Sequence, residues 1–513
     1  MKRPKIFFLA DALNWKQCML AKQAMKQAVL FAQKGYEVVL LTFDFDALYP
    51  YLRSLACQEG RLSKQISVRN MFEDLAGGCS SRYVHNLPVF DMAPFEEKGQ
   101  VRKQTDTTYL IESGDGQDKK IMLTKQGSLS RIRHADALNR QCLEDFDPWG
   151  KLRRKTFLDE IDQVRQEIYY NMKGKACLSI WHNRKTGRPD KVHRLTDKGA
   201  IYKEYTGGLL KLEADWLQEV LAAEKHPFVI SYGQNTDQVL MHADVQQAVK
   251  ILHLDAHHKH PESDSEAAAI YRLLEESGFS NLDGVLLPTE SQKKQLSSRF
   301  GSADKMYVIP YCPEQKETGL GLFSRLKKDK RLAVAISRFG SRQSCEQILK
   351  AFQLVLADHP EAVLHFYGKT SEKAYFTKVH EQLGLGKQAI FKAFEEISRQ
   401  VCEPALFSII PTKYGDVSFP VLESMSYRTP VINYHEKPLT QREDTEDGQY
   451  GFRVRTDSIS KLAACMQQLF QYPAKTLDMG MKAKRYVDKH FSKDLVVLKW
   501  QAFVDDMLAE KDA

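Results

Sequence analysis

Residues 6–43 read IFFLADALNWKQCMLAKQAMKQAVLFAQKGYEVVLLTF and contain a strand, helix, strand pattern. The first apolar run is short and continuous, as is typical of a buried strand. Residues 21–34 then repeat apolar side chains at helical spacing, and Gly35 is suited to end that helix. Residues 37–43 form a second apolar run, typical of a buried parallel strand. The stretch predicts a doubly wound α/β domain, whose ligands bind at the carboxyl ends of its strands.

The same alternation of strands and helices returns after residue 206. Strands are predicted at residues 228–232, 250–254, 282–287, 307–310, 332–336, 362–367, 406–410 and 430–434, and helices at 266–276, 345–357 and 493–508. The last helix repeats Val496, Trp500, Val504 and Met507 along one face, which predicts packing against a core. The basic residues 324–331 are predicted to form a solvated linker between two lobes, because lysine-rich segments resist burial.

Residues 81–205 favour β-structure instead. Apolar residues alternate on either side of Gly114-Asp115-Gly116, and residues 177–181 and 192–195 form a candidate hairpin across 183–187. Residues 156–170 look helical, and no internal repeat is visible. The predicted organisation is an N-terminal lobe (1–80 and 206–323), a β-rich insertion (81–205), a C-terminal lobe (324–490) and a terminal helix (491–513).

Composition excludes several classes of protein. A chain of 513 residues is too long for a single hydrophobic core, and its 43% of hydrophobic residues is enough for two or three cores. Its nine cysteines are scattered and lack C-x-x-C spacing, which favours a reducing compartment. The apolar run that follows the basic start ends at Asp11, too early for a signal peptide, and no window approaches a membrane span. We therefore expect a cytoplasmic protein with at most peripheral contact at the inner membrane face. The net charge of +8 favours anionic partners only weakly, and no nucleic-acid partner is expected.

Residues 408–432, SIIPTKYGDVSFPVLESMSYRTPVI, carry a family resemblance. They resemble the donor-site segment of glycosyltransferase family 4, which has the B-type fold (GT-B) of two Rossmann-like lobes. In that family a glutamate, seven residues and a second glutamate precede a helix that ends in Gly-x-Pro-Val-Ile. Glu423 matches the second glutamate, whereas Gly415 stands at the first and Asp416 follows it.

The resemblance is narrower to bacterial poly(glycerol-phosphate) and poly(ribitol-phosphate) α-glycosyltransferases and to glycosyltransferases of serine-rich surface proteins. The segments that carry it are residues 22–38, 282–292, 299–301 and 308–310, together with the insertion. It implies a retaining transferase that moves a hexose or N-acetylhexosamine from a UDP-sugar to a teichoic-acid-like polymer or a surface protein. It also implies a homo-oligomer or a partner glycosyltransferase, and no metal or cofactor.

The resemblance assigns several residues to the donor. Arg338 matches the family arginine that faces the diphosphate, where a fixed cation stabilises the leaving group. Gln343 replaces the expected lysine, and the adjacent Arg342 is a candidate substitute. Glu423 matches the carboxylate that accepts hydrogen bonds from the ribose; alternatively, it is a first-turn glutamate stabilised by the helix dipole. Ser418 and Phe419 precede that helix, where free backbone amides bind phosphate or sugar oxygens.

Two further candidates lie near the reacting sugar. Asp416 either substitutes for the missing glutamate or points away, and these interpretations are evenly balanced. His257 matches the second of two family histidines three residues apart, unless His258 or, after a small shift, His253 takes that role. A metal site in this histidine-rich segment is disfavoured, because no thiolate accompanies it.

A second hypothesis belongs to a different class of protein. Gly415, Gln343 and the absence of glycine from residues 14–19 each remove a feature of the family's site. These losses favour a catalytically degenerate homologue that binds an acceptor or stabilises a partner transferase.

Overall fold

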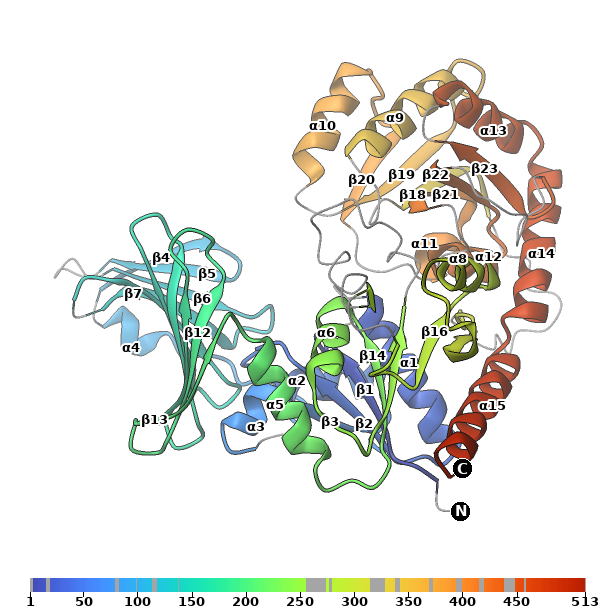
Figure 1. Cartoon of the computed structure of the whole chain (residues 1–513). Coiled ribbons are helices and arrows are strands. Elements are labelled where there is room, and N and C mark those ends of the chain that lie inside the picture. The colour runs from blue at the N-terminus through green and yellow to red at the C-terminus, as the bar shows by residue number, and fades with distance from the viewer. Residues whose placement is uncertain are drawn as a thin grey trace. The chain divides into compact units, whose positions relative to one another are not determined.

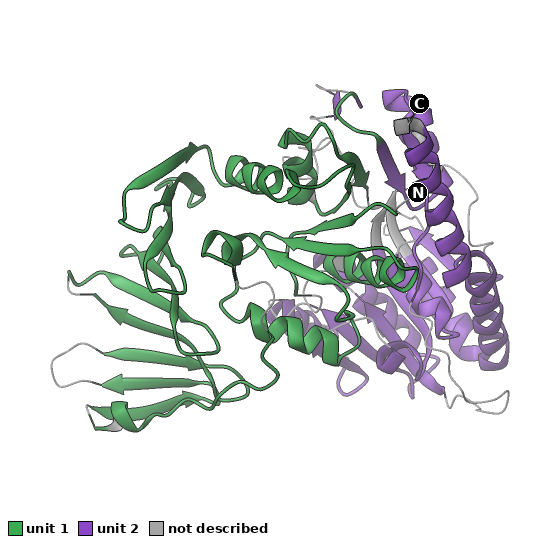
Figure 2. Cartoon of the chain, turned by 90° about the horizontal axis from the view of Figure 1, so that it is seen from below, with its two compact units in different colours: residues 1–253, 280–283 green, residues 254–279, 284–513 purple. Residues whose placement is uncertain are grey.

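The computed structural model describes residues 3–14, 19–78, 83–97, 99–112, 118–136, 138–254, 274–275, 279–313, 328–336, 342–368, 372–393, 399–414, 419–437, 448–455 and 458–512. The chain (Figure 1) divides into two compact units, residues 1–253 with 280–283 and residues 254–279 with 284–513, which Figure 2 shows in green and purple. The predicted α/β class is confirmed, with two parallel sheets and an antiparallel insertion.

The first parallel sheet has the strand order β17-β16-β15-β14-β1-β2-β3, and its last five strands belong to the first unit. Its strands are β1 (Ile6–Ala10), β2 (Val38–Thr42), β3 (Ser67–Asn70), β14 (Phe228–Tyr232), β15 (Val249–His253), β16 (Gly284–Leu287) and β17 (Met306–Val308). The first unit also contains α1 (Met19–Gln33), α2 (Tyr49–Gln58), α3 (Met71–Leu75), α5 (Leu210–Leu221) and α6 (Gln234–His242). Every residue of β1 is buried between its parallel neighbours β2 and β14, as the apolar runs predict. The strand order reverses direction beside β1, which is where ligands of doubly wound sheets bind.

The insertion is a ten-stranded antiparallel meander, in which each strand pairs with its neighbours in sequence. It comprises β4 (Gln100–Thr105), β5 (Thr108–Glu112), β6 (Lys119–Leu123), β7 (Leu129–Ala135), β8 (Gln141–Phe146), β9 (Leu152–Leu158), β10 (Val164–Tyr170), β11 (Ala176–His182), β12 (Pro189–Leu195) and β13 (Ile201–Thr206), and α4 (Ala93–Glu96) precedes it. The predicted hairpin between β11 and β12 is confirmed. The Gly114-Asp115-Gly116 turn lies outside the described residues.

The predicted helix over residues 156–170 is wrong, because this segment forms β9, a turn and β10. Apolar residues at 157, 161, 164 and 168 happen to follow helical spacing. Asp159 Oδ1 accepts the backbone N–H groups of Ile161 at 3.1 Å and Gln163 at 2.8 Å. The resulting tight turn separates two strands, so the apparent helical period is accidental.

One turn design recurs among the hairpins of the meander. Six hairpin turns begin at Thr124, Asp136, Asp147, Asp159, Asn171 and Thr196. In each, the side-chain oxygen of the first residue accepts the backbone N–H four residues later. The residue three positions on has a positive φ: Gly127, Asn139, Gly150, Asp162, Gly174 and Gly199. From Thr124 to Asn171 the turns recur every 11 or 12 residues, a signal that is readable from the sequence.

We expect Gly174→Ala to destabilise the insertion by about 1–2 kcal/mol, the cost of a left-handed conformation for a residue with a Cβ. Gly174 has a φ of +75°, and an added Cβ would meet nothing within 4 Å, so the cost comes from the backbone alone. Gly174→Asn is the matched control and should cost less, because Asn139 already occupies the equivalent position with a φ of 59°. Urea unfolding measures both, and equal losses in the two variants would contradict the assignment.

The second unit is built on a parallel sheet with the order β20-β19-β18-β21-β22-β23. Its strands are β18 (Asp329–Ile336), β19 (Val363–Gly368), β20 (Ala389–Ala393), β21 (Ala405–Tyr414), β22 (Val431–Lys437) and β23 (Gly451–Arg455). Its helices include α8 (Glu290–Phe300), α9 (Arg342–Leu356), α10 (Lys373–Gln382), α11 (Arg399–Cys402), α12 (Phe419–Ser426), α13 (Ile459–Gln471), α14 (Pro473–His490) and α15 (Lys493–Asp512), with a 3-10 turn at Ala303–Lys305. The predicted stripe of α15 is confirmed, since Val496, Trp500, Val504 and Met507 are all buried. The predicted helix over 266–276 lies almost wholly outside the described residues.

The basic linker expected at residues 324–331 is wrong at its C-terminal end, because β18 already begins at Asp329. Lys328 is half-buried and donates hydrogen bonds to Glu403 O, Ala405 O and Thr429 Oγ1 at 2.7–3.2 Å. Burial lowers the pKa of its ammonium group to about 8. Three acceptors thus replace the solvent that a lysine-rich segment was expected to need.

Candidate functional site

Half of the residues assigned to the site by resemblance lie in the described part of the chain. Arg342, Gln343, Phe419 and Glu423 are described, and all belong to the second unit. Arg338, Asp416, His257 and Ser418 lie outside the described residues. Their roles remain predictions, and the geometry of the site is built below from the helices that follow β18 and β21.

Helix α9 begins with two of the residues predicted to lie beside the donor diphosphate. Arg342 and Gln343 are its first two residues, and both are exposed. The guanidinium of Arg342 lies 5.6 Å from the ring centroid of Tyr375 on α10, a cation–π contact. Tyr375 in turn donates a hydrogen bond to Glu346 Oε2 at 2.8 Å. This contact holds the cation near the start of α9, where backbone N–H groups also favour an anion.

Helix α12 carries the predicted donor carboxylate. Glu423 is its fifth residue and is 0% exposed, so it lies beyond the first turn and the helix-dipole interpretation does not explain it. Phe419, the first residue of α12, is buried with its ring 6.0 Å from that of Tyr311 in an edge-on contact. A carboxylate withdrawn from water on a short apolar helix is costly unless it is used or compensated.

The position of α12 is fixed from two sides. Ser424 Oγ shares a 2.7 Å hydrogen bond with Ser408 Oγ of β21 and donates to Thr429 O at 3.2 Å. Helix α14 approaches so closely that a Cβ on Gly480 would lie 2.2 Å from Arg428 O. Glu423 is therefore held by a rigid strand, helix, strand unit rather than by a loop.

The carboxyl edge of the first unit's sheet gathers acidic groups. Asp11 follows β1, and its Oδ1 accepts the Thr236 N–H at 3.3 Å at the start of α6. Asp44 follows β2 and accepts a hydrogen bond from the Tyr49 hydroxyl, which itself accepts the Leu13 N–H at 3.2 Å. A Cβ on Gly233 would lie 2.6 Å from Asp11 Oδ2, so a larger residue at this position would displace the carboxylate.

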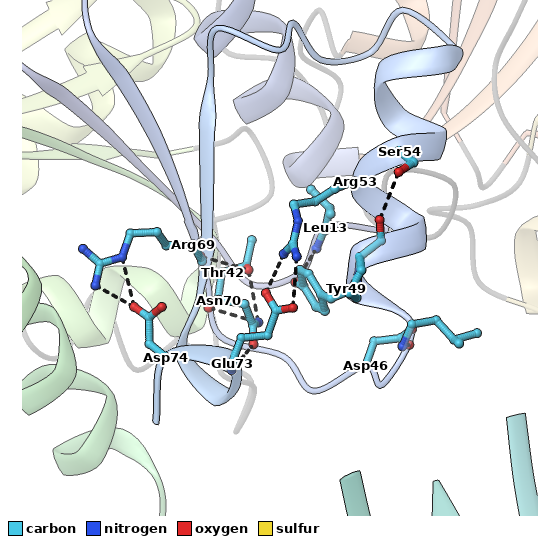
Figure 3. Close-up of polar contacts among 12 residues, drawn as sticks. Leu13, Thr42, Asp46, Tyr49, Arg53, Ser54, Arg69, Asn70, Glu73 and Asp74 are labelled. Atoms are coloured by element: carbon cyan, nitrogen blue, oxygen red, sulfur yellow. Dashed lines mark hydrogen bonds and ion pairs between the residues drawn. The ribbon is translucent and has the colours of Figure 1, made fainter. Parts of the chain in front are cut away.

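A buried ion pair supports this edge (Figure 3). Arg53 of α2 donates hydrogen bonds to Glu73 of α3 through its two terminal guanidinium nitrogens, with N–O distances of 2.5 and 3.1 Å. The Arg53 side chain is 0% exposed. Asn70, at the end of β3, donates to Asp44 O at 2.7 Å and accepts the Glu73 N–H at 3.2 Å. The pair and the amide together link α2, α3 and the loop after β2.

Two acids at this edge have pKa values near neutrality. Burial raises the pKa of Asp44 to about 7, although the Tyr49 hydrogen bond opposes the shift. Burial also raises the pKa of Glu213 on α5 to about 7, against a hydrogen bond from Asn235. Asp11 adds to both shifts by like-charge repulsion. Groups that titrate near the working pH are suited to transfer protons.

We expect Asp44→Asn to flatten the pH dependence of stability between pH 4 and 8. An unfolded aspartate ionises near 3.8 and the folded one near 7, so the folded chain binds more protons and loses stability as pH rises through this window. The variant should therefore be more stable than the wild type at pH 8 and similar at pH 4, as measured by chemical denaturation. Asp136→Asn, at a carboxyl group whose pKa is lowered by its bonds to Arg140, is the control and should not gain stability at pH 8.

Sequence reasoning missed this acidic edge, although a signal was present. Asp11 and Asp44 come directly after the apolar runs of β1 and β2, where a parallel sheet places its ligands. His253, an alternative for the family histidine, ends β15; it is 4% exposed and its ring stacks on Tyr232 at 4.4 Å. His253 therefore lies at the same edge of the sheet, but its side chain is buried against a neighbouring strand.

Comparison with known proteins confirms the resemblance. Residues 323–486 match the family described as "Glycosyl transferases group 1". A poly(ribitol-phosphate) α-N-acetylglucosaminyltransferase of Staphylococcus aureus is 18% identical over 97% of this chain and 98% of its own. A poly(glycerol-phosphate) α-glucosyltransferase of Bacillus subtilis is 20% identical over 98% of this chain and 75% of its own. The crystal structure of the pneumococcal O-GlcNAc transferase GtfA with UDP and GlcNAc covers 99% of this chain and 100% of its own, with 16% identity and a TM-score of 0.75, and shares its fold.

The helices of the described ranges were compared with the length and hydropathy that a membrane span requires. None of the helices there is both long enough and apolar enough to span a bilayer.

Proposed function

Since residues 323–486 carry a group 1 glycosyltransferase domain, we propose that this chain is a retaining transferase that uses a UDP-sugar. It moves a hexose or N-acetylhexosamine to a teichoic-acid-like polymer or a surface protein, the acceptor classes suggested by the names of its relatives. The observation that carries the proposal is the buried carboxylate of Glu423 on α12, within the segment that matches the family.

The chemistry assigned to this chain divides between its two units. In the second, Glu423 accepts hydrogen bonds from the donor ribose, and the cations at residues 338 and 342 stabilise the departing diphosphate. In the first, Asp44 and Glu213 have pKa values near 7, which suits groups that exchange protons with a bound acceptor. The sugar is transferred from the diphosphate oxygen to the acceptor oxygen, and the released proton balances the charge.

A degenerate homologue that binds an acceptor or supports a partner transferase is the second candidate. It is favoured by Gln343, which stands exposed at the start of α9 where the family has a lysine. This candidate predicts acceptor or partner binding without donor turnover.

Nucleotide titration separates the two candidates. A ligand that binds only the folded state raises the melting temperature, and at 100 times its Kd it adds about 2.7 kcal/mol. We expect UDP, UDP-glucose or UDP-GlcNAc to stabilise the wild type, and Arg338→Ala to reduce that stabilisation. If no nucleotide raises the melting temperature and no donor is hydrolysed, the degenerate candidate replaces the transferase.

A further inference from the structure

Three side chains of metal-ligating types meet on one face of the insertion. His134 of β7 is paired directly with Cys142 of β8, and Glu144 lies two residues further along β8. Side chains alternate between the faces of a sheet and directly paired residues share a face, so all three project from the same side. One ligating atom from each, a ring nitrogen, a sulfur and a carboxylate oxygen, lies within 4.8 Å of the other two.

The imidazole of His134 has the orientation of a metal ligand. Its Nδ1 lies 2.7 Å from Ala135 O, and a carbonyl oxygen can only accept, so Nδ1 carries a proton. In the neutral ring the lone pair of Nε2 is then directed at Glu144 Oε2, 3.5 Å away. Two lone pairs at this distance repel each other unless a proton or a metal ion lies between them. A hydrogen bond from Nδ1 to a backbone carbonyl is typical of histidines that bind a metal through Nε2.

Two other histidine–glutamate contacts in the insertion have the spacing of a hydrogen bond instead. His182 Nε2 lies 3.0 Å from Glu167 Oε2, and His193 Nε2 lies 2.8 Å from Glu204 Oε2. Neither forms a three-ligand group with the described residues around it. Two ligands that are each roughly 2.0–2.3 Å from a tetrahedral zinc ion are about 3.3–3.8 Å apart. The 3.5 Å separation at His134 therefore fits two ligands of one ion better than a bridging proton.

The sulfur and the carboxylate are both able to take part. Cys142 is 1% exposed, and its thiol donates a long hydrogen bond to Leu143 O at 3.9 Å, which a metal ion can replace. Glu144 divides its oxygens, since Oε1 lies 2.8 Å from Lys155 Nζ and Oε2 faces His134. Lys155 thus fixes the carboxylate from the far side, although its positive charge opposes a cation. We therefore expect micromolar affinity rather than the tighter binding of a closed structural site.

We propose that His134, Cys142 and Glu144 form a site for a divalent cation of the zinc class, with water as the fourth ligand. Zinc takes nitrogen, thiolate and carboxylate ligands, and sites with three protein ligands keep one exchangeable position. The largest separation within the group, at most 4.8 Å, shortens by about 1 Å on binding. The sulfur–metal bond replaces the S–H bond of the thiol, and the proton passes to solvent. The ion cross-links β7 and β8, and the site does not depend on the proposed function.

Titration of the full, untagged chain with Co²⁺ tests the site. Thiolate bound to cobalt gives a charge-transfer absorption in the near ultraviolet, and tetrahedral cobalt gives d–d bands in the visible. The histidine-rich residues 253–260 contain no cysteine, so metal bound there does not produce the charge-transfer band. We expect one thiolate-bound ion per chain with a micromolar Kd. Zn²⁺ should displace it and remove the d–d bands, because its d shell is filled.

Two variants and two matched controls assign the signal. Cys142→Ser should abolish the charge-transfer band. His134→Gln should raise the Kd for Co²⁺ by about 100-fold or more, because loss of an outer partner alone costs roughly 10- to 100-fold. Cys177→Ser changes a half-buried thiol on β11 of the same sheet, and His193→Gln removes a histidine from a glutamate pair without a thiol. Both controls should bind Co²⁺ like the wild type.

Urea midpoints measured without metal show which variants fold. If Cys142→Ser does not fold, His134→Gln still decides, because the His134 side chain is 18% exposed and its replacement leaves the strand pairing in place. The proposal is overturned if the wild type gives no thiolate band or if the band persists in folded Cys142→Ser. It is also overturned if His193→Gln weakens Co²⁺ binding as much as His134→Gln does.

Discussion

Glu423→Gln should lower sugar transfer by about 10- to 100-fold while leaving the fold intact. Glutamine keeps the size of the side chain but removes the negative charge that we assign to the donor ribose. A hydrogen bond to a charged acceptor contributes roughly 1.5–3 kcal/mol, and each 1.4 kcal/mol corresponds to a factor of ten. The side chain is fully buried on a helix braced by Ser408 and Gly480, so neighbouring groups cannot readily move to compensate.

The measurement is donor hydrolysis and transfer, combined with the UDP-induced rise in melting temperature. Both should fall together in Glu423→Gln, while the melting temperature without nucleotide should not decrease. Glu403→Gln is the matched control in the same unit, because that carboxylate is paired with Arg399 at the surface and should leave both readouts unchanged. Wild-type turnover in Glu423→Gln would remove the donor role from α12.

The parallel sheets were predictable because a buried parallel strand must be apolar on both faces. The run over residues 228–232 matches β14 without error, and the alternation of such runs with helices predicts the doubly wound topology. The helix predicted over 156–170 was wrong because the four apolar residues there are compatible with both a helix and a pair of strands. The turn made by the Asp159 side chain decides in favour of the strands. The prediction that Lys328 lies in a solvated linker was wrong because the three groups that accept its hydrogen bonds belong to residues 75 to 101 positions away.

Some features of the candidate site could be predicted from the sequence, and others could not. Glu423 and the start of α9 could be located from a motif, since their positions depend on local sequence. The pairing of Arg53 with Glu73 and the near-neutral pKa values of Asp44 and Glu213 depend on burial, which emerges only when distant segments pack. The repeated turn is visible in the sequence as Thr, Asp or Asn followed three residues later by Gly, Asn or Asp.

Arg53→Met should destabilise the first unit by about 3–5 kcal/mol, the largest stability effect that we expect. The substitution keeps the apolar volume but leaves the Glu73 carboxylate buried without its cation. Chemical denaturation measures the loss. Arg69→Met is the matched control (Figure 3): the Arg69 side chain is 36% exposed and pairs with Asp74 at 2.7 Å, so its removal should cost no more than about 1 kcal/mol.

The double variant Arg53→Met/Glu73→Leu distinguishes a lost attraction from an uncompensated charge. If the cost of Arg53→Met comes from the stranded carboxylate, removing that carboxylate should recover most of the lost stability, because apolar replacements of buried ion pairs are often neutral or better. If the pair instead contributes through its own attraction, the double variant should stay as unstable as the single one. Recovery of stability with loss of transfer would further show that the pair serves to position the loop bearing Asp44, which Asn70 ties to Glu73.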